Sequence, residues 1–228
     1  MRVAIVPARS GSKRIKNKNI INFYGKPIIQ HTINFLFKTN KFDKIYISTD
    51  SKKISDISEE CGAEVPFLRT KKLSDDHAPT HEVICDMIDR LSLSKDSSVF
   101  CVYPTAILLK KKDILDGIKL LNNNKNNFVI CVSKTSDNIT RSFKVSKLDK
   151  ISSFLSKKKK YKSSHGLNKY YADLGYFYAA KASTWINNNQ SIILNASVVK
   201  FPKNRSVDIN DYEDLELAKL MYKNIYHK

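Results

Sequence analysis

Short continuous apolar runs alternate with amphipathic stretches from residue 2 to residue 133, and this alternation constrains the fold more than any other feature. The apolar runs have the length of strands and are apolar at successive positions, which is typical of strands buried on both faces of a parallel sheet. Each amphipathic stretch is long enough for a helix that crosses to the next strand. The pattern predicts a three-layer α/β fold with a mostly parallel sheet and right-handed crossovers.

The boundaries of the expected elements follow from these patterns. We expect strands at the apolar runs 2–7, 43–49, 63–68, 98–104, 128–133, 175–186 and 191–202. We expect helices where apolar residues recur at helical spacing, at 27–39, after Ser51, at 83–91, at 113–121 and from about Asp211. Pro27 suits the first turn of a helix, and Ser51 suits a helix N-cap.

The alternation breaks down between residues 134 and 170, where the chain is polar, rich in lysine and without sustained periodicity. We expect this segment to leave the main sheet. No linker separates independent parts of the sequence. Residues 1–228 are therefore expected to form a single domain that carries 134–170 as an insertion.

The net charge of +18 favours binding to any polyanion, so a basic nucleic-acid-binding module is one class of function to consider. The excess charge is mostly lysine scattered among Asn and Ile residues. The densest run, Lys157–Lys160, contains no aromatic residue on which a base could stack. The sequence therefore does not favour nucleic acid as a partner.

Cysteine spacing and hydropathy argue against a zinc-binding protein, a disulfide-rich protein and a membrane protein. The four cysteines lie far apart and form no cluster at zinc spacing, which indicates reduced thiols: Cys61, Cys85, Cys101 and Cys131. No stretch reaches the roughly 18 apolar residues that a membrane span requires. The apolar start before Pro7 is too short for the core of a signal peptide, so we expect a cytoplasmic protein without a membrane partner.

The loop after the first expected strand, at 7–19, has the composition of an anion-binding site. Open α/β sheets bind ligands at the carboxyl ends of their strands. Gly11 permits a positive φ, which would turn neighbouring backbone N–H groups toward an anion. The turn is surrounded by enough positive charge for a triphosphate, supplied by Arg9, Lys13, Arg14, Lys16 and Lys18. The loop matches neither the dinucleotide-binding nor the P-loop glycine pattern.

The loop resembles the motif of the CMP-sialic acid synthetase family of cytidylyltransferases, and the resemblance continues in order along nearly the whole chain. The matching segments are Ala8-Arg9, Ser12-Lys13, Lys18-Asn19, Ser48-Thr49-Asp50, Phe67-Leu68-Arg69, Leu73-Ser74-Asp75-Asp76, Thr80, Tyr103-Pro104-Thr105 and Val207-Asp208-Ile209-Asn210. The combination is much more specific than any one motif. It implies a nucleotidyltransferase (Rossmann-like) fold and a homodimer in which 134–170 reaches the neighbouring subunit.

The resemblance also implies a reaction. CMP would pass from CTP to the anomeric hydroxyl of an acidic nine-carbon 2-keto sugar, with release of pyrophosphate, for surface glycans or flagellin. The implied nucleotide-binding residues are Ala8, Arg9, Ser10, Gly11, Ser12, Lys13, Lys18, Asn19, Arg69 and Thr80. Arg9, Lys13 and Lys18 would act as catalytic groups together with Asp208. Mg²⁺ is the implied cofactor, held by Asp208 with Asn210 or Asp211.

The chain departs from the family at Asn210, where an aspartate is usual. Asn210 offers a neutral carbonyl oxygen and hence a less charged metal site. Asp211 is the next carboxylate, and the alternative role for it is to cap the final helix. A catalytically weak relative that only binds nucleotide is therefore a further hypothesis.

The acceptor sugar is inferred from the stretch 170–178, which resembles the pseudaminic acid branch of the family, although Tyr171, Leu174 and Tyr176 depart from that pattern. Legionaminic or sialic acid is the alternative acceptor, and 3-deoxy-manno-octulosonic acid is a more distant one. The residues expected to bind the sugar are Tyr103, Thr105, Arg141 and Asp173. Asp173 has the alternative role of shaping a turn.

Overall fold

The computed structural model describes residues 1–76, 78–123, 128–135, 170–187 and 191–226, together with the strand segments 143–145 and 151–153. The predictions made for Arg141 and for the run Lys157–Lys160 lie outside the described residues, as does most of the insertion. No helix in the described ranges is long and apolar enough to cross a membrane. The four cysteines are free thiols, of which Cys101 and Cys131 are buried.

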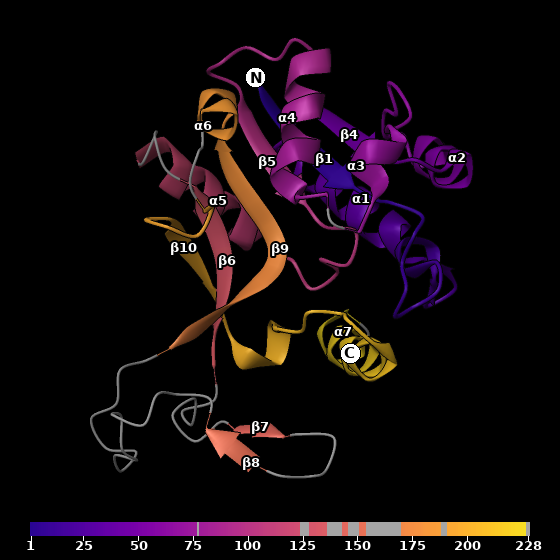
Figure 1. Cartoon of the computed structure of the whole chain (residues 1–228), viewed down its shortest axis with the longest axis vertical. Helices are drawn as coiled ribbons and strands as arrows, with labels where there is room; N and C mark the ends of the chain where they lie inside the picture. Colours follow the sequence, from indigo (N-terminus) through magenta and orange to yellow (C-terminus); the bar gives the residue numbers. More distant parts are fainter. Residues whose placement is uncertain are drawn as a thin grey trace.

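A six-stranded sheet forms the centre of the molecule, in the strand order β10-β6-β9-β5-β1-β4 (Figure 1). Its strands are β1 (Arg2–Pro7), β4 (Lys44–Ser48), β5 (Ser98–Val102), β6 (Val129–Lys134), β9 (Tyr171–Lys181) and β10 (Ser197–Phe201). β4, β1 and β5 are parallel, and so are β6 and β10, whereas β9 runs antiparallel between the two groups. The predicted α/β fold with a mostly parallel sheet is confirmed.

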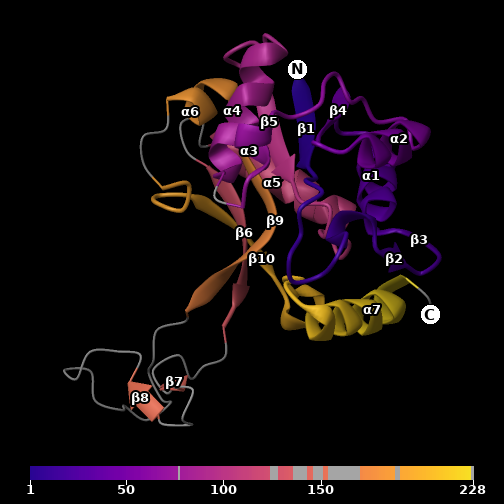
Figure 2. The same ribbon diagram turned by 45° about the vertical axis from the view of Figure 1, so that its right-hand side comes forward.

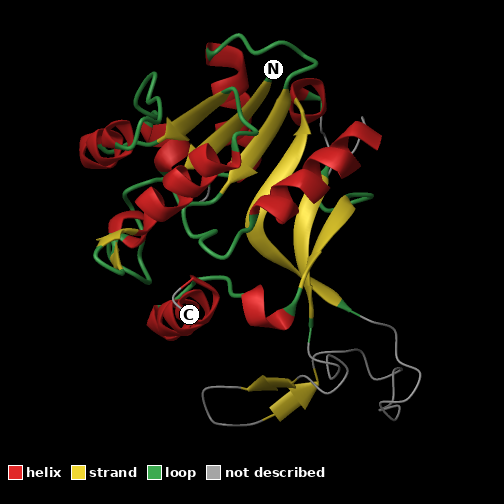
Figure 3. Cartoon of the chain, turned by 180° about the vertical axis from the view of Figure 1, so that it is seen from behind, coloured by secondary structure: helices red, strands yellow, loops and turns green. Residues whose placement is uncertain are grey.

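Helices cover both faces of this sheet, which gives the three predicted layers (Figure 3). One face packs against α1 (Ile28–Thr39), α2 (Lys52–Glu60), α5 (Lys111–Asn123) and α7 (Tyr212–Tyr226). The other packs against α4 (Thr80–Arg90) and α6 (Ala182–Ile186). Ser51 caps α2 as predicted, by accepting a hydrogen bond from the backbone N–H of Ile54. Pro27 occupies the N-cap of α1 rather than its first turn.

Short elements connect these layers close to the carboxyl ends of the strands. They are the 3₁₀ helices η1 (Lys18–Ile20) and η3 (Lys203–Arg205), the strands β2 (Asn22–Phe23) and β3 (Lys26–Pro27), and the single-turn helix α3 (Lys71–Ser74). β2 and β3 pair as a separate antiparallel ribbon before α1.

Three expected strands differ from the structure. The segment 63–68 makes only two isolated bridges to the sheet edge, and Pro66 within it has no N–H to donate to a ladder. The expected strand 175–186 ends at Lys181, and the remainder forms α6, where the indole of Trp185 donates to the carbonyl of Val99 at 3.2 Å. Within the expected strand 191–202, only Ser197–Phe201 pairs with the sheet.

The insertion contributes a separate two-stranded sheet, in which β7 (Phe143–Val145) pairs antiparallel with β8 (Ile151–Ser153). Figures 1 and 2 both place this pair away from the six-stranded sheet. The expected departure from the main sheet is therefore seen for β7 and β8. The dimerisation role of 134–170 stays a prediction.

β9 is interrupted by a bulge that matters for the site. Its pairing with β6 jumps from Tyr178 opposite Ile130 to Asp173 opposite Val132, so β9 has extra residues at this point. Gly175 lies within the bulge with a φ of +58°, a conformation that glycine adopts without strain. The bulge brings Asp173 and Tyr178 together although they are five positions apart.

Gly117 is required where α5 packs on the sheet. A Cβ at this position would lie 2.9 Å from Cζ of Phe177 and 3.4 Å from Cε1 of Phe100, and both rings are fully buried. Alanine favours a helix over glycine by up to about 1 kcal/mol, but overpacking a core costs roughly 1–3 kcal/mol. We expect Gly117→Ala to lower the free energy of unfolding by about 1–2 kcal/mol, measured by urea titration.

Shortening the ring that causes the clash provides the control. Phe177→Leu removes the atoms that a Cβ at Gly117 would meet, so the double variant should lose less stability than the two single changes added together. A Gly117→Ala protein as stable as the wild type would show that α5 can shift away from the sheet at no cost.

Candidate functional site

A cavity of about 390 Å³ lies at the carboxyl ends of β1 and β5, where the loop after β1 faces the segment between α3 and α4. Its wall contains ten of the predicted site residues: Arg9, Ser12, Lys13, Lys18, Asn19, Arg69, Thr80, Tyr103, Thr105 and Asn210. Six other described candidates lie outside the wall: Ala8, Ser10, Gly11, Asp173, Asp208 and Asp211. The structure therefore brings together residues that are up to about 200 positions apart in the sequence.

The loop after β1 is fixed at its start by the neighbouring strand β4. The backbone N–H of Ala8 donates to the carbonyl of Ser48 at 2.8 Å. The backbone N–H and hydroxyl of Ser10 donate to the two carboxylate oxygens of Asp50, at 2.8 and 2.7 Å. The amide of Asn19 then donates to the carbonyl of Arg9 at 2.9 Å, which closes the loop on itself. Ala8 and Ser10 thus shape the loop rather than face the cavity.

The cations of the loop differ in their degree of burial. Arg9, Lys13, Arg14 and Lys18 all line the cavity. Lys18 is the most enclosed of the loop lysines, and its ammonium donates to the carbonyl of Ile209 at 2.8 Å. Burial lowers the pKa of Lys18, although the nearby carboxylate of Asp208 opposes this shift. Lys18 therefore loses its proton more readily than an exposed lysine does.

A carboxylate from another part of the chain already pairs with two of these cations. Asp76, from the segment between α3 and α4, forms salt bridges with Arg9 and with Lys13. Hydrogen bonds from Lys13 and Arg9 lower the pKa of Asp76, and the hydrogen bond to Asp76 raises the pKa of Lys13. The charged forms of Asp76 and Lys13 therefore stabilise each other.

Arg69 forms the buried floor of the cavity. Its side chain donates through Nε to the hydroxyl of Ser48 at 3.1 Å and through Nη2 to the carbonyl of the same residue. Burial lowers the pKa of the Arg69 guanidinium. These bonds tie the end of β4 to the segment that precedes α3, so Arg69 holds a fixed position.

Aromatic residues join the cavity to the bulge in β9. The hydroxyls of Tyr103 and Thr80 lie 2.6 Å apart, and the Tyr103 ring contacts the edge of the Tyr178 ring at a centroid distance of 6.0 Å. The phenol of Tyr178 donates to Asp173 at 2.6 Å, and the backbone N–H of Gly175 donates to the other oxygen of that carboxylate at 3.0 Å. Asp173 therefore has the turn-shaping role, and its role in sugar binding stays a prediction.

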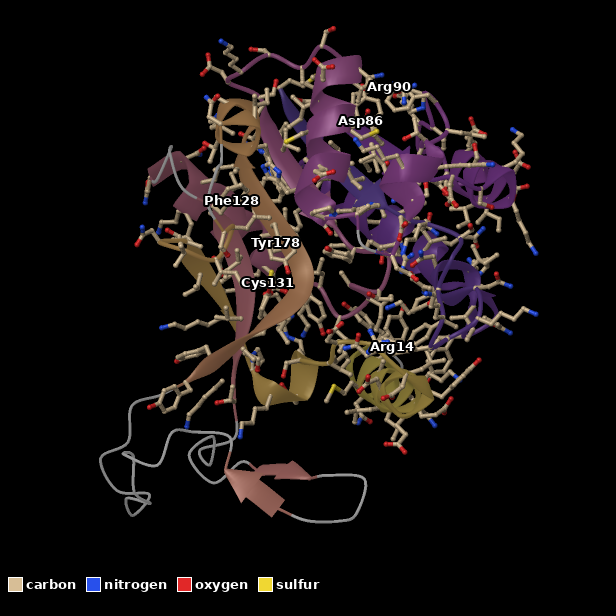
Figure 4. All side chains as sticks on the ribbon, in the orientation of Figure 1. Arg14, Asp86, Arg90, Phe128, Cys131 and Tyr178 are labelled. Carbon is tan, nitrogen blue, oxygen red and sulfur yellow. The ribbon has the colours of Figure 1, made fainter. Side chains whose placement is uncertain are left out.

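The late acidic motif approaches the loop from the side of α7. The amide oxygen of Asn210 accepts from Nη2 of Arg14 at 2.6 Å, and its amide nitrogen donates to Asp208 at 2.6 Å. Figure 4 shows Arg14 beside α7. An arginine can only donate and a carboxylate can only accept, so these partners fix which way the amide points.

Asp211 has a capping role at the start of α7. Its carboxylate accepts from the backbone N–H of Asp214 at 2.9 Å, and Asp214 in turn accepts from the backbone N–H groups of Asn210 and Asp211. This reciprocal pattern satisfies the free N–H groups of the first helical turn. The structure thus shows the alternative that the sequence offered for Asp211, and metal binding by it stays a prediction.

A divalent metal fits this motif through Asp208 rather than through Asn210. The amide oxygen of Asn210 is turned toward Arg14, and one oxygen of Asp208 accepts from Asn210. Among the described residues, no group of three or more His, Cys, Asp or Glu side chains could hold a metal. Mg²⁺ commonly uses one or two carboxylates and completes its shell with phosphate oxygens and water. Asp208 fits that kind of site.

Sequence reasoning gave no role to several residues that position the site. Asp50 and Asp76 lie in the segments that match the family. Their roles become visible only in the structure, where Asp50 accepts hydrogen bonds from Ser10 and Asp76 pairs with Arg9. Arg205, just before the acidic motif, makes a two-pronged ion pair with the buried Asp113 at 2.6 and 3.0 Å. Asp113 also accepts from the N-cap backbone of α5, at Lys110. In the sequence, Asp113 directly follows three lysines, and nothing in that pattern marks it as the buried partner of Arg205.

Comparisons with known proteins agree with this geometry. A family model described as cytidylyltransferase matches residues 3–225. Pseudaminic acid cytidylyltransferase of Campylobacter jejuni is 35% identical over 224 residues, which cover 97% of this chain and 96% of the relative. CMP-N,N'-diacetyllegionaminic acid synthase of Legionella pneumophila is 37% identical over 123 residues, 52% of each chain.

Solved structures share the fold at low sequence identity. CMP:2-keto-3-deoxy-manno-octonic acid synthetase, solved in complex with CTP, superposes with a TM-score of 0.74 at 14% identity, and the match covers 98% of this chain and 99% of the other. A 4-diphosphocytidyl-2C-methyl-D-erythritol synthase superposes with a TM-score of 0.67 at 10% identity over 96% and 97% of the two chains.

The pair of Arg205 and Asp113 should be essential for the position of the acidic motif. Removing one member of a buried ion pair leaves the other charge uncompensated and costs about 3–5 kcal/mol. We expect Asp113→Ala to lower the free energy of unfolding by about that amount, measured by urea titration. Arg205→Ala should also destabilise the protein.

The double variant Asp113→Ala/Arg205→Ala tests whether the cost arises from the unpaired charge. With both groups removed, the loss should be clearly smaller than the sum of the two single losses. Simple additivity would mean that the two residues stabilise the protein independently, and that the ion pair does not anchor η3 to α5.

Proposed function

The chain belongs to the cytidylyltransferase family, and we propose on this premise that it transfers CMP from CTP to the anomeric hydroxyl of pseudaminic acid and releases pyrophosphate. The observation that carries the proposal is the meeting of the cationic loop with the late acidic motif. Lys18 contacts Ile209, and Arg14 contacts Asn210, so both motifs border one cavity at the carboxyl ends of the strands. That is where open α/β sheets bind their ligands.

The proposed reaction is an in-line displacement at the α-phosphorus of CTP. The anomeric oxygen forms a bond to this phosphorus as the bond to the bridging oxygen of pyrophosphate breaks, and the hydroxyl proton passes to water. Arg9, Lys13 and Lys18 would hold the phosphate oxygens and stabilise the charge that builds up on pyrophosphate. Arg69 and Thr80 would place the cytidine from the opposite wall.

Mg²⁺ is the proposed cofactor, with Asp208 as its protein ligand. The metal would supply positive charge beside the phosphate oxygens. Asp208 lies close enough to Lys18 to affect the pKa of that lysine, which supports a common role in phosphate binding. Asn210 would hold Arg14 toward the cavity, where its guanidinium adds a further cation.

The acceptor would occupy the side of the cavity formed by Tyr103 and Thr105. Both residues line the cavity, and Tyr103 connects it through Tyr178 to Asp173. Pseudaminic acid is favoured over legionaminic acid because the relative that matches nearly the whole chain is named for pseudaminic acid. A homodimer and a cytoplasmic location remain part of the proposal.

The first experiment measures pyrophosphate release from CTP and Mg²⁺ with pseudaminic, legionaminic and N-acetylneuraminic acids offered separately. We expect release with pseudaminic acid, and a loss of roughly a hundredfold or more in kcat for Asp208→Ala, because a group that stabilises the transition state is removed. Release only with another sugar would change the assigned substrate. If CTP binds but none of the three sugars leads to pyrophosphate release, the proposed reaction is contradicted.

The lowered pKa of Lys18 predicts how CTP affinity depends on pH. In the free protein this lysine loses its proton below the usual lysine pKa, whereas bound phosphates favour the charged form. Above the lowered pKa, binding must take up a proton, so Kd should rise by roughly tenfold per pH unit. Below that pKa the dependence should vanish. Calorimetry with CTP between pH 7 and 10 measures this curve.

Lys18→Arg identifies the group responsible, because arginine stays protonated throughout this range. This variant should lose the alkaline rise in Kd, while Lys112→Arg, on the exposed side of α5, should keep it. The same alkaline rise in Lys18→Arg as in the wild type would assign the titration to another group.

A further inference from the structure

The phosphate-binding cations of the loop already hold an anion that belongs to the protein. The two carboxylate oxygens of Asp76 pair with different cations, one with Nη1 of Arg9 and the other with the ammonium of Lys13. A phosphate group would make the same kind of two-point contact. All three side chains line the cavity.

The position of Asp76 in the chain allows this contact to open. Asp76 follows α3, which is a single turn with no buried residue, and precedes α4. Its side chain is 24% exposed, and that of Lys13 is 81% exposed. Neither partner is locked in the core, in contrast to Arg69 on the floor of the cavity. Separating Asp76 from the loop therefore requires no rearrangement of the sheet or the long helices.

We propose that Asp76 is an internal substitute for a phosphate group, which the terminal phosphates of CTP displace and which returns to Arg9 and Lys13 when pyrophosphate leaves. The inference rests on the proposed function. Its consequence is that Asp76 weakens the binding of pyrophosphate and so shortens the time that this product stays in the site.

Competition explains why such a residue helps turnover. A loop with several cations and no counter-charge would bind any phosphate compound tightly, including the product. A ligand that must first displace an internal group binds with an affinity reduced by the fraction of protein in the open state. CTP has the cytidine contacts to offset this cost, whereas pyrophosphate has only its charges.

Neutralising Asp76 tests the inference through binding alone. We expect Asp76→Asn to tighten the binding of pyrophosphate and CTP roughly three- to tenfold. The ligands then no longer have to displace the ion pairs that Asp76 makes with Arg9 and Lys13, which are partly exposed and therefore weak. CMP, whose single phosphate lies at the site of attack rather than at Arg9 and Lys13, should bind with unchanged affinity. Calorimetry with each of the three compounds measures these constants in the absence of sugar.

Two further variants control for charge and for folding. Asp116→Asn removes the same charge from an exposed ion pair with Lys112 on α5, outside the cavity wall, and should change none of the three affinities. Asp76→Ala removes the remaining hydrogen-bonding capacity and should behave as Asp76→Asn does. In steady state, pyrophosphate should inhibit both Asp76 variants at lower concentrations than it inhibits the wild type.

The possible outcomes separate this inference from the proposed reaction. Unchanged or weaker pyrophosphate binding in both Asp76 variants would overturn it, since Asp76 would then be neutral or would support the ligand. Equal tightening of CMP would also overturn it, because the effect would be a general change in charge. Tighter pyrophosphate binding without turnover of any sugar would support the role of Asp76 and contradict the proposed reaction.

Discussion

Mutual repulsion among the cations of one short loop is the constraint on which the rest of the site depends. Arg9, Lys13, Arg14 and Lys18 share one cavity wall, and like charges this close raise the free energy of the folded state. Each cation has a partner from a distant part of the chain: Asp76 for Arg9 and Lys13, Asn210 for Arg14, and the carbonyl of Ile209 for Lys18. The loop can therefore keep its charge because the fold brings two distant segments to it, one with Asp76 and one with Ile209 and Asn210.

The sequence predicted well what depends on local periodicity. Continuous apolar runs placed β1, β4, β5 and β6, and the hydroxyl of Ser51 marked the start of α2, because both signals arise from neighbouring residues. The sequence-based prediction was wrong where tertiary contacts determine the end of an element. The end of β9 at Lys181 depends on Trp185 reaching the carbonyl of Val99, and this contact joins residues 86 positions apart.

The candidate site divides in the same way. Residue type and spacing were enough to choose Arg9 and Lys18, because a triphosphate requires such cations at the carboxyl end of a strand. Arg69 was chosen only from the family resemblance. The contact between Tyr178 and Asp173 depends on a bulge whose register cannot be deduced from alternation, since residues 174–180 form one run without alternating polar positions. Residues that position the site are harder to predict than residues that bind the ligand, because the role of a positioning residue depends on which distant residue it contacts.

Asn210 shows how one neutral side chain serves two charged neighbours. Arg14 requires an acceptor and Asp208 requires a donor, and an amide is the side chain that offers both in a fixed plane. An aspartate here would satisfy Arg14 but would set a second carboxylate against Asp208, a repulsion that a bound divalent cation would relieve. With asparagine, Arg14 and Asp208 both have a hydrogen-bond partner in the same amide. In the proposed site, Asn210 would therefore hold the Arg14 guanidinium toward the phosphates, beside the positive charge that a metal on Asp208 would supply.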